Sequence, residues 1–414
     1  MLNLRVDHIL EFFKDNTYDT LRKIHEDELL SKREVDGLWI ANASKELHSP
    51  TEWHQQLAKG IVYTADFKLV SLPLAKMWNA HEMEQDQAEE VNDLWADEDH
   101  TALLYILEKL DGTCLSRFVY NNKVYLSTRG VLLGDEYDSD YVQQALAIAN
   151  EKYPLLMDPR FMQNQTLIFE LLFPEGRILT DYGDRRDLVL IACFDGYAFR
   201  YKTYQELIDI SEYLHLTLVQ RYVAMGNGPW EQMDNLLEQI KGTDAEGFMM
   251  TIEQNGQLVY RMKFKGADYI RMLRLMNYCT YKHVVEMILD DRNLLSRDAF
   301  MGMLKQNSGD DLPQYVIDEY MILHNKYNEF VDGVTQYCVH MKKFFDTHIE
   351  NKTVPLSRED KKWFAHFVAL LPDKGFYFKF ADGKTVDELA ESICKDARQD
   401  VDYLEKYGVT IVYG

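Results

Sequence analysis

A lysine at the end of a predicted buried strand is the clearest candidate for chemistry in this sequence. Residues 102–107 form a continuous apolar run, which predicts a buried strand, and Glu-Lys-Leu-Asp-Gly-Thr follows at 108–113. A buried ammonium group tends to lose its proton or gain a partner, and a neutral lysine is a nucleophile. Gly112 would permit a sharp turn, while Asp111 would orient the amine of Lys109 or hold the turn. Because such a pattern also arises by chance at strand ends, it needs support from the rest of the chain.

Charged residues at the ends of other predicted strands give that support. The cations are Lys59, Lys76, Arg129, Lys263 and Lys265, and the carboxylates within or at the start of otherwise apolar strands are Glu170 and Glu246. Taken singly, each is more often a snorkelling side chain or a solvated carboxylate. Together they fit the attack of a lysine on a nucleotide α-phosphate. Cations lower the pKa of the nucleophile and meet the charge on phosphorus, and carboxylates hold Mg²⁺ or the ribose hydroxyls.

The spacing of apolar residues predicts a mixed N-terminal part that would position these groups. Helices are expected at 5–14, 17–30, 138–152, 203–213 and 229–241. Strands are expected at 37–40, 61–63, 67–72, 102–107, 115–120, 123–128, 167–173, 178–182, 188–194 and 246–250, and in a strand that ends with 260–265. The acidic segment 81–99 is expected to be a solvated helix or loop.

From about residue 268 the sequence changes to helical spacing. Helices are expected in 268–290, 296–305, 313–349, 358–371 and 386–407, with a short strand at 376–380. The sequence therefore predicts an α+β fold with two domains, 1–267 and 268–414.

Composition limits the setting in which the protein acts. The chain has 414 residues, 46% of them hydrophobic, which is typical of a globular protein with a substantial core. Its five cysteines are scattered and odd in number, which predicts free thiols in a reducing compartment. No apolar run reaches the length of a membrane span, and the N-terminus lacks the features of a signal peptide. We therefore expect a cytoplasmic protein without membrane contact.

The net charge of −23 argues against a general nucleic-acid-binding surface. Net charge governs long-range steering, however, and not the chemistry of a local site. A nucleotide phosphate is a small anion that a focused cationic pocket can bind.

The order of these residues resembles that of a known superfamily. Residues 109–112 resemble motif I of the covalent nucleotidyltransferases, which include ligases and capping enzymes. Phe169-Glu170 resembles motif III, residues 178–182 motif IIIa, Glu246-Gly247 motif IV and Lys263-Phe264-Lys265 motif V, in the same order. Residues 76–82, Lys-Met-Trp-Asn-Ala-His-Glu, are similar to the Lys-Phe-Phe-Asn-x-x-Glu element of the bacteriophage-type RNA ligase 1 family. Lys59-Gly60-Ile61 stands where that family has Arg-Gly-Ile, and Tyr269 follows motif V as it does there.

The resemblance, which covers roughly residues 35–270, implies roles for individual residues. Lys109 would carry AMP, with Asp111 and Gly112 in the same ATP site. Glu170 would contact the ribose, and Glu246, with Glu170, would bind Mg²⁺ or Mn²⁺. The cations are assigned to phosphates: Lys263 and Lys265 to the α-phosphate, and Lys59, Lys76 and Arg129 to the ATP phosphates or the RNA 5′-phosphate. Trp78 or Tyr182 would pack near the nucleotide.

The resemblance also implies a reaction and its partners. Residues 1–267 would be an adenylyltransferase domain built on antiparallel sheets with flanking helices, and the helical residues 268–414 would select the RNA. An ATP-dependent RNA ligase of this kind joins RNA 5′-phosphate and 3′-hydroxyl ends through lysyl-AMP and RNA-adenylate intermediates. It would act as a monomer in RNA repair, for example on cleaved tRNA, in the host cytoplasm if phage-encoded.

Several departures and alternatives remain open in the sequence. Lys59 replaces an arginine, Arg129 stands where the family usually has lysine, and Thr113 replaces serine. A DNA ligase or an mRNA guanylyltransferase is the first alternative, although these enzymes usually carry an OB-fold after motif V. A non-catalytic RNA-end-binding protein is the second, and the retained motif residues argue against it. A helical interaction protein in which every motif is accidental is the third.

Overall fold

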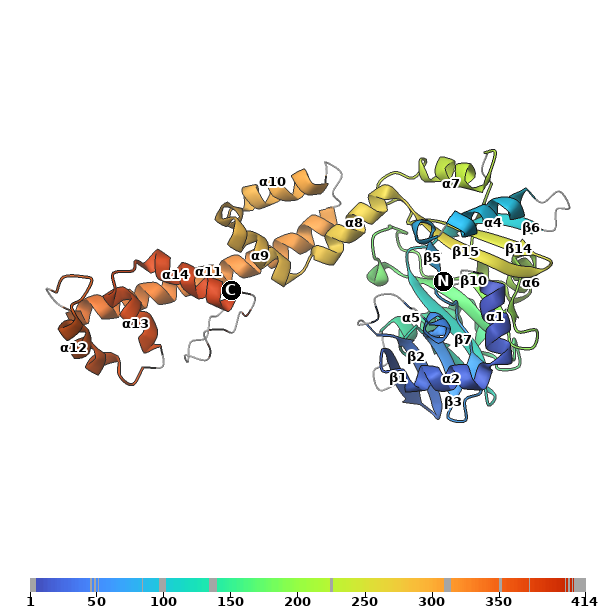
Figure 1. Ribbon diagram of the computed structural model, residues 1–414, viewed down its shortest axis with the longest axis horizontal. Helices are drawn as coiled ribbons and strands as arrows, with labels where there is room; N and C mark the ends of the chain where they lie inside the picture. The colour runs from blue at the N-terminus through green and yellow to red at the C-terminus, as the bar shows by residue number, and fades with distance from the viewer. Residues whose placement is uncertain are drawn as a thin grey trace. The chain divides into compact units, whose positions relative to one another are not determined.

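The computed structural model of this protein describes residues 5–405, except 45–46, 48–49, 51, 84, 97–101, 134–139, 224–225, 309–313, 350–351, 372, 399, 401–402 and 404. Its contacts divide the chain into two compact units, Met1–Ile270 and Arg271–Gly414. All strands among the described residues lie in the first unit, and the second is helical (Figure 1). The predicted α+β class is therefore confirmed.

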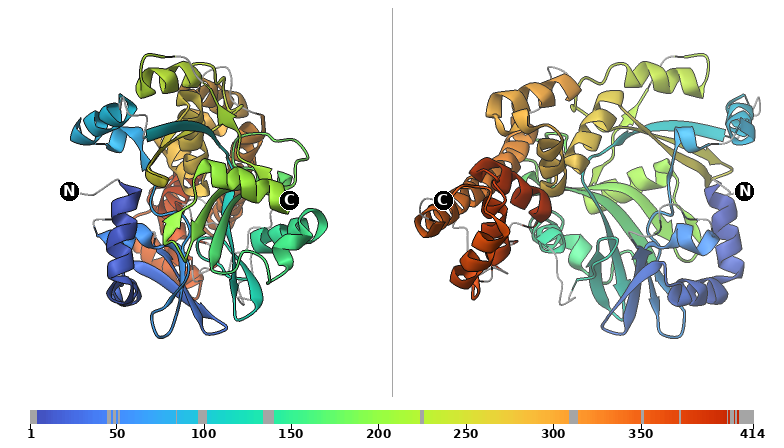
Figure 2. Two further views of the ribbon diagram at one scale, coloured as in Figure 1. Left: turned by 90° about the vertical axis from the view of Figure 1, so that its right-hand side faces the viewer. Right: turned by 60° about the vertical axis from the view of Figure 1, so that its left-hand side comes forward.

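Three sheets form the framework of the first unit (Figure 2). The first has the order β1 (Leu30–Val35), β2 (Leu38–Ala43), β3 (Lys59–Thr64), β4 (Leu69–Ser71). The second has the order β11 (Arg200–Tyr201), β10 (Asp187–Asp195), β9 (Gln165–Leu172), β7 (Thr113–Tyr120), β8 (Lys123–Ser127), with β12 (Thr217–Leu218) beside β10. The third has the order β13 (Arg221–Tyr222), β6 (Ala102–Lys109), β14 (Gly247–Gln254), β15 (Gln257–Lys265), β5 (Trp78–Asn79).

The sheets are largely antiparallel because hairpins connect many of their strands. The parallel pairs among the described strands are β10 with β12 and β15 with β5. The predicted hairpin of β7 and β8 turns at Asn121 and Asn122, which have φ angles of 47° and 57°. Two consecutive positive φ values are typical of a type I′ turn, and asparagine tolerates them.

The helices of the first unit cover the sheets with their apolar faces. They are α1 (Val6–Asp15), α2 (Thr17–Glu26), α3 (Trp53–Leu57), α4 (Gln85–Trp95), α5 (Asp140–Lys152), α6 (Tyr204–Leu214), α7 (Pro229–Leu237) and the beginning of α8 (Ala267–Tyr278). Val91 of α4 and Met233 of α7 pack on one face of the third sheet, against Ile106 and Met262. The opposite face of that sheet contributes Leu107 and other residues to a core shared with the second sheet.

The second unit is organised around one long helix. Its elements after α8 are α9 (Tyr281–Asp290), α10 (Arg297–Ser308), α11 (Gln314–Ile349), α12 (Arg358–Val368), α13 (Lys374–Ala381) and α14 (Val386–Ala397). The helix α11 buries Tyr320, Tyr327, Phe330 and other residues at helical spacing along its length. Across the part of the chain that the structure describes, no helix has the length and apolar character needed to cross a membrane.

The strand predicted at 178–182 is wrong, because this segment is an irregular turn. Its backbone N–H groups at Leu179 and Thr180 donate to the carboxylate of Asp111, at 2.9 and 2.8 Å. Its Leu179 carbonyl accepts from the guanidinium of Arg177. Side chains therefore use the polar backbone groups that a neighbouring strand would otherwise use.

The strand predicted at 376–380 is also wrong, because these residues lie in the helix α13. Phe376, Tyr377 and Phe380 are buried, and their spacing follows a helix as well as a short apolar run. Phe380 packs against Phe345 of α11, with ring centroids 6.0 Å apart. Tertiary packing therefore decides between the two structures that this aromatic segment could form.

Other elements differ in extent from the prediction. The helix expected at 17–30 ends at Glu26, and the strand β1, which was not predicted, begins at Leu30. The segment 268–290 forms two helices, because Thr280 caps the second by accepting a hydrogen bond from the His283 N–H. The helix expected at 386–407 ends at Ala397, and much of the remainder lies outside the described residues.

Candidate functional site

The strands of the third sheet bring three of the predicted site residues to one face, in two neighbouring rows. Lys109 ends β6 and is directly opposite Gly247 of β14, which in turn is opposite Lys265 of β15. Because side chains alternate between the faces of a strand, Lys263 lies on the same face as Lys265. In the next row, Lys263 is opposite Met249. The sheet thus places the candidate nucleophile and the two motif V lysines on the face that looks toward the second sheet.

Glu246 joins two of these lysines through its carboxylate. Oε2 accepts a hydrogen bond from Lys109 Nζ at 2.5 Å, and Oε1 pairs with Lys265 Nζ at 2.7 Å. Glu246 is only 4% exposed, and a buried carboxylate requires such cationic partners. The paired charges hold the amine of Lys109 at a fixed position at the end of its strand.

Asp111 holds the turn after the nucleophile and does not orient its amine. Its Oδ2 accepts from the N–H groups of Leu179 and Thr180, and its Oδ1 accepts from the hydroxyl of Tyr269 at 2.5 Å. Its own N–H donates to the hydroxyl of Tyr182 at 2.9 Å. Of the two roles that the sequence suggests for Asp111, the structure supports the second. Tyr269, to which the sequence assigns no role, is therefore a structural part of the site.

Gly112 allows β9 to approach the turn closely. Its N–H donates to Glu170 Oε1 at 3.2 Å. A Cβ at this position would lie 2.5 Å from the Leu171 carbonyl oxygen and 2.8 Å from Leu172 Cδ2. Since one of these atoms belongs to the backbone, a larger residue could be accommodated only by moving the strand or the turn.

The Gly112→Ala variant is therefore expected to lower any lysine-dependent nucleotidyl transfer by about 100-fold, because a displacement of about 1 Å misaligns the reacting atoms. Initial rates of covalent labelling with α-labelled ATP would measure the effect. Gly302→Ala is the matched control, because a Cβ there meets nothing within 4 Å. Equal rates for the two variants would contradict the close approach.

The remaining predicted cations line an open pocket beside Lys109. The pocket has a volume of about 660 Å³ and is lined by Lys59, Lys76, Lys109, Gly112, Arg129, Glu170, Lys263 and other residues. Burial, Arg129 and Lys76 lower the pKa of Lys59 to about 8. Burial and the charges of Lys76, Lys109 and Lys265 lower the pKa of Lys263 to about 8, against an opposing effect of Glu82. Cations that lie close together despite burial and mutual repulsion form a binding site for a polyanion such as a triphosphate.

Binding of a non-reactive ATP analogue is expected to weaken as the pH rises through about 8. Below that pH Lys59 and Lys263 are protonated and attract phosphate. Above it they are neutral in the free protein and must take up protons on binding, so affinity should fall by about tenfold or more between pH 7.5 and 9.5. Lys263→Arg, which keeps its charge, should flatten the profile. Equilibrium binding at constant ionic strength would test this, and a flat wild-type profile would contradict it.

The two carboxylates of the site differ in chemistry. Burial, opposed by Lys109, raises the pKa of Glu170 to about 8, so this group is largely neutral near pH 7. A neutral carboxyl is a poor metal ligand but a suitable partner for a ribose hydroxyl. Glu246 lies at the nucleophile, and Mg²⁺ typically binds one or two carboxylates together with substrate phosphates. The donors thus fit an ion held by Glu246 and a nucleotide. The described residues contain no self-contained group of three or more metal-ligating side chains.

The two aromatic candidates occupy different positions. Trp78 is buried in the core on the far face of the third sheet, and Lys76 Nζ lies 4.6 Å from the centroid of its ring. Tyr182 holds the Asp111 turn and lines a separate cavity of about 110 Å³. In the described residues, neither lines the cationic pocket.

Sequence reasoning missed a small apolar pocket next to Lys109. It has a volume of about 50 Å³ and is lined by Leu74, Met77, Leu107, Glu108, Lys109, Leu110, Glu170, Ile191, Val219, Met249 and Arg261. Strand alternation from Lys263 and Lys265 could have placed Arg261 on this face. Nothing in the sequence indicated Ile191 or Val219, which the second sheet brings to the pocket from distant positions.

The sequence matches a known family over just over half of its length. Residues 57–269 match a family model described as RNA ligase. No curated protein matches the chain in sequence.

Solved structures resemble the chain at low sequence identity. An RNA ligase mutant from Naegleria gruberi with AMP and Mn is 13% identical, with 46% of this chain and 55% of that chain covered and a TM-score of 0.36. The Naegleria gruberi RNA ligase with PPi is 13% identical, with coverage of 54% and 62% and a TM-score of 0.35. An archaeal ATP-dependent RNA ligase is 11% identical, with coverage of 75% and 80% and a TM-score of 0.45. The chain thus spans little more than half the length of the first of these structures.

Proposed function

This chain belongs to the RNA ligase family of the nucleotidyltransferase superfamily, and on that premise we propose that it is an ATP-dependent ligase that joins RNA ends through AMP bound covalently to Lys109. The observation that carries the proposal is the pairing of Lys109 with the buried Glu246 at 2.5 Å, beside a pocket lined by four further cations. A nucleophile, a fixed proton acceptor and a phosphate site are the parts that such a reaction requires.

In the first step, Lys109 attacks the α-phosphorus of ATP. The attacking amine must first lose a proton, and Glu246 Oε2 is in position to accept it. A P–N bond forms, the bond between the α-phosphorus and the bridging oxygen breaks, and pyrophosphate leaves. Lys263 and Lys265 lie where they can stabilise charge at the α-phosphate, while Lys59, Lys76 and Arg129 meet the rest of the triphosphate. Magnesium or manganese bound to the nucleotide would supply further positive charge for the departing pyrophosphate, and Glu246 would be its protein ligand while the carboxylate is ionised.

Two transfers to RNA complete the proposed reaction. An oxygen of the RNA 5′-phosphate attacks the α-phosphorus of lysyl-AMP, the P–N bond breaks, and Lys109 returns to its free form. A 3′-hydroxyl then attacks the activated 5′-phosphate, forms the phosphodiester and expels AMP. The order of bond changes follows from the family, and repair of broken RNA such as cleaved tRNA, by a monomer in the cytoplasm, is the role that we propose with it.

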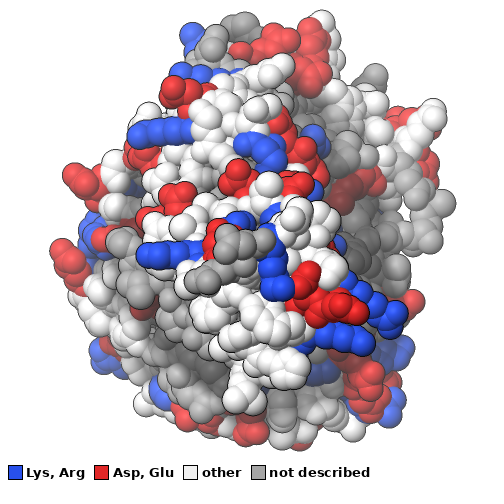
Figure 3. Space-filling model, turned by 90° about the vertical axis from the view of Figure 1, so that its left-hand side faces the viewer, with Lys and Arg blue, Asp and Glu red and all other residues white. Residues whose placement is uncertain are grey.

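The helical unit is proposed to bind single-stranded RNA through aromatic side chains on α12. Trp363 and Phe367 are 42% and 45% exposed, and their ring centroids lie 4.8 Å apart. Lys352 Nζ lies 4.9 Å from the Trp363 ring, and His348 packs against Phe367. Exposed rings next to a cation are typical of surfaces on which bases stack. In the view of Figure 3, Lys and Arg side chains are interspersed with Asp and Glu, so binding by charge alone is not favoured there.

The double variant Trp363→Ala, Phe367→Ala is expected to lower RNA joining at limiting RNA by about tenfold or more, because stacking contributes about 1–3 kcal/mol per base. Labelling of Lys109 should be unchanged. Leu370→Ala is the matched control, because Leu370 is 97% exposed in the segment that follows α12 but has no ring. An equal loss in this control would indicate a general apolar contact and contradict stacking.

The test of the proposed function is a labelling experiment with the full chain. The protein is first treated with pyrophosphate to remove bound AMP, and is then incubated with magnesium and ATP labelled at the α-phosphate. A covalent band with ATP, absent with GTP, supports the proposal, and joining of RNA but not DNA ends completes it. A band with GTP alone would indicate a guanylyltransferase. The absence of any band would overturn the ligase proposal in favour of RNA-end binding.

A further inference from the structure

Arg261 is a partly buried arginine that makes few hydrogen bonds within the protein. It lies on β15 and lines the small apolar pocket beside Lys109. Among the described residues, its Nη2 donates to the Ile191 carbonyl at 3.3 Å, and its buried Nε donates to none of them. A guanidinium carries five N–H donors, and a buried donor that has no partner, as Nε of Arg261, is costly. Burial accordingly lowers the pKa of Arg261.

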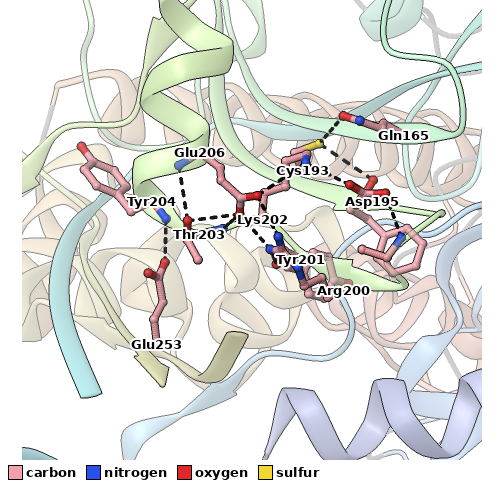
Figure 4. Close-up of polar contacts among 12 residues, drawn as sticks. Gln165, Cys193, Asp195, Arg200, Tyr201, Lys202, Thr203, Tyr204, Glu206 and Glu253 are labelled. Carbon is pink, nitrogen blue, oxygen red and sulfur yellow. Dashed lines mark hydrogen bonds and ion pairs between the residues drawn. The ribbon is translucent and has the colours of Figure 1, made fainter. Parts of the chain in front are cut away.

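The charge of a nearby acidic residue raises the pKa of Arg261, against the larger effect of burial, but its carboxylate forms its hydrogen bond with another group. This residue is Glu253, which is 4% exposed. Figure 4 shows its carboxylate accepting a hydrogen bond from the backbone N–H of Tyr204, at 2.6 Å, where the helix α6 begins. Arg261 and Glu253 are therefore not joined in an ion pair that would explain the burial of the guanidinium.

Arg117 provides an internal comparison, because each of its three guanidinium nitrogens donates a hydrogen bond within the protein. Its side chain is 0% exposed and donates to three backbone carbonyls, those of Leu156, Asp158 and Phe161, at 2.8–3.0 Å. An arginine with a structural role in this fold is thus satisfied by fixed acceptors. Among the described residues Arg261 has one such acceptor, the Ile191 carbonyl, and it lines a pocket, which is the arrangement expected for a residue that binds a ligand.

The position of the pocket identifies the part of the ligand that would enter it. In register, Arg261 is two residues from Lys263 and four from Lys265 on the same face of β15, while Lys109 of β6 is opposite Gly247. Leu107 and Met249 are paired with each other in the row next to that of Lys109 and Gly247, and they form an apolar surface of the pocket. Ile191 and Val219 line the same pocket from the second sheet and from the segment that follows β12. A nucleotide with its α-phosphate at Lys109 and its ribose at Glu170 would place a flat, apolar ring system in this pocket.

We propose that Arg261 is the residue that recognises the base of the nucleotide, by donating a hydrogen bond from its guanidinium to a ring nitrogen of adenine. This inference rests on the proposed function, because it takes ATP as the ligand. Adenine offers N1, N3 and N7 as acceptors, and a guanidinium N–H that faces the pocket gains a partner when it meets one of them. Arg261 thereby contributes to the affinity for the base of the nucleotide and takes no part in the transfer of the phosphoryl group.

The test compares ligands with and without a base. At pH 7.5, equilibrium binding of a non-reactive ATP analogue and of inorganic tripolyphosphate is measured for the wild type and for Arg261→Met. We expect the variant to bind the ATP analogue about 10- to 100-fold more weakly and tripolyphosphate within about twofold of the wild type. Arg261→Lys keeps the charge but loses the planar guanidinium, so its affinity for the ATP analogue should lie between those of the wild type and Arg261→Met. Equal losses for both ligands, or no loss for either, would overturn the proposal.

A second measurement identifies the accepting atom. Analogues of ATP in which N1, N3 or N7 is replaced by carbon are compared on the wild type and on Arg261→Met. One of them should bind the wild type at least about fivefold more weakly, and the variant should not distinguish it from ATP. If all three bind both proteins like ATP, the arginine does not contact a ring nitrogen.

Failure of the inference is distinguishable from failure of the proposed function. If the wild type forms a covalent adduct with ATP but Arg261→Met binds ATP normally, the ligase proposal stands and the role of Arg261 is wrong. If the wild type binds neither ATP nor its analogue, both fail. Arg200→Met is the matched control: Arg200 is paired with Glu206 in the network of Figure 4, and its loss should leave the affinity for ATP unchanged.

Discussion

The Lys109→Ala variant is expected to form no covalent adduct with α-labelled ATP, a loss of at least about 1,000-fold relative to the wild type. Lys109 is the lysine whose amine is held at the end of β6 by Glu246, and alanine leaves no nucleophile at that position. Gel electrophoresis under denaturing conditions would measure the adduct, and mass spectrometry of the wild type would place AMP on the peptide that contains residue 109.

The Lys109→Arg variant distinguishes the role of Lys109 as a nucleophile from its role as a positive charge. Arginine stays protonated and cannot form the adduct, but it retains the cation that pairs with Glu246. We therefore expect this variant to bind a non-reactive ATP analogue within a few-fold of the wild type while forming no adduct. An adduct that persists in Lys109→Ala would assign the nucleophile to another lysine of the pocket, and the peptide that carries AMP would identify it.

The Arg117→Met variant is expected to be destabilised by about 3–5 kcal/mol, because the fully buried guanidinium is lost and three buried or partly buried backbone carbonyls lose their partner at once. Those carbonyls belong to Leu156, Asp158 and Phe161, in the segment that leads into β9. Since β9 carries Glu170 and packs against the turn at Gly112, loss of this anchor should also loosen the site.

Thermal unfolding followed by circular dichroism would measure this loss. For a unit of this size, the expected destabilisation corresponds to a fall of at least about 6 °C in the melting temperature. Arg261→Met is the internal control, because Arg261 makes one long hydrogen bond within the described part of the protein and its removal should change the melting temperature little. If Arg117→Met has the melting temperature of the wild type, the three carbonyls have other hydrogen-bond partners. Arg117 is then no example of a structurally required arginine with which Arg261 can be compared.

Much of the candidate site could be predicted because its residues lie on strands. Strand alternation places Lys263 and Lys265 on one face whatever surrounds them, and an apolar run that ends in lysine predicts where the candidate nucleophile stands. The order of Lys109, Glu170, Glu246 and the two lysines along the chain therefore supports a functional hypothesis without knowledge of which strands are neighbours.

The sequence could not show how carboxylates are shared among cations. Glu246 bridges Lys109 and Lys265, and Asp111 holds the turn at Leu179. The bonds of Glu246 to Lys109 and of Asp111 to Leu179 each join segments more than 60 residues apart along the chain. The same long-range bonds explain the wrong strand at 178–182, because side chains supply partners that the local pattern cannot reveal. Tertiary packing also determines that Trp78 lies in a hydrophobic core, away from the pocket.

By itself, the sequence of this protein determined the candidate nucleophile, the types of charge around it and the α+β class, because these follow from residue chemistry and from short-range periodicity. Only the tertiary structure decided which charges meet, whether residues 376–380 form a strand or a helix, and that Arg261 is left with unused donors beside an apolar pocket. The physical reason is that desolvation and hydrogen-bond partnership depend on segments that are distant in sequence and close in space.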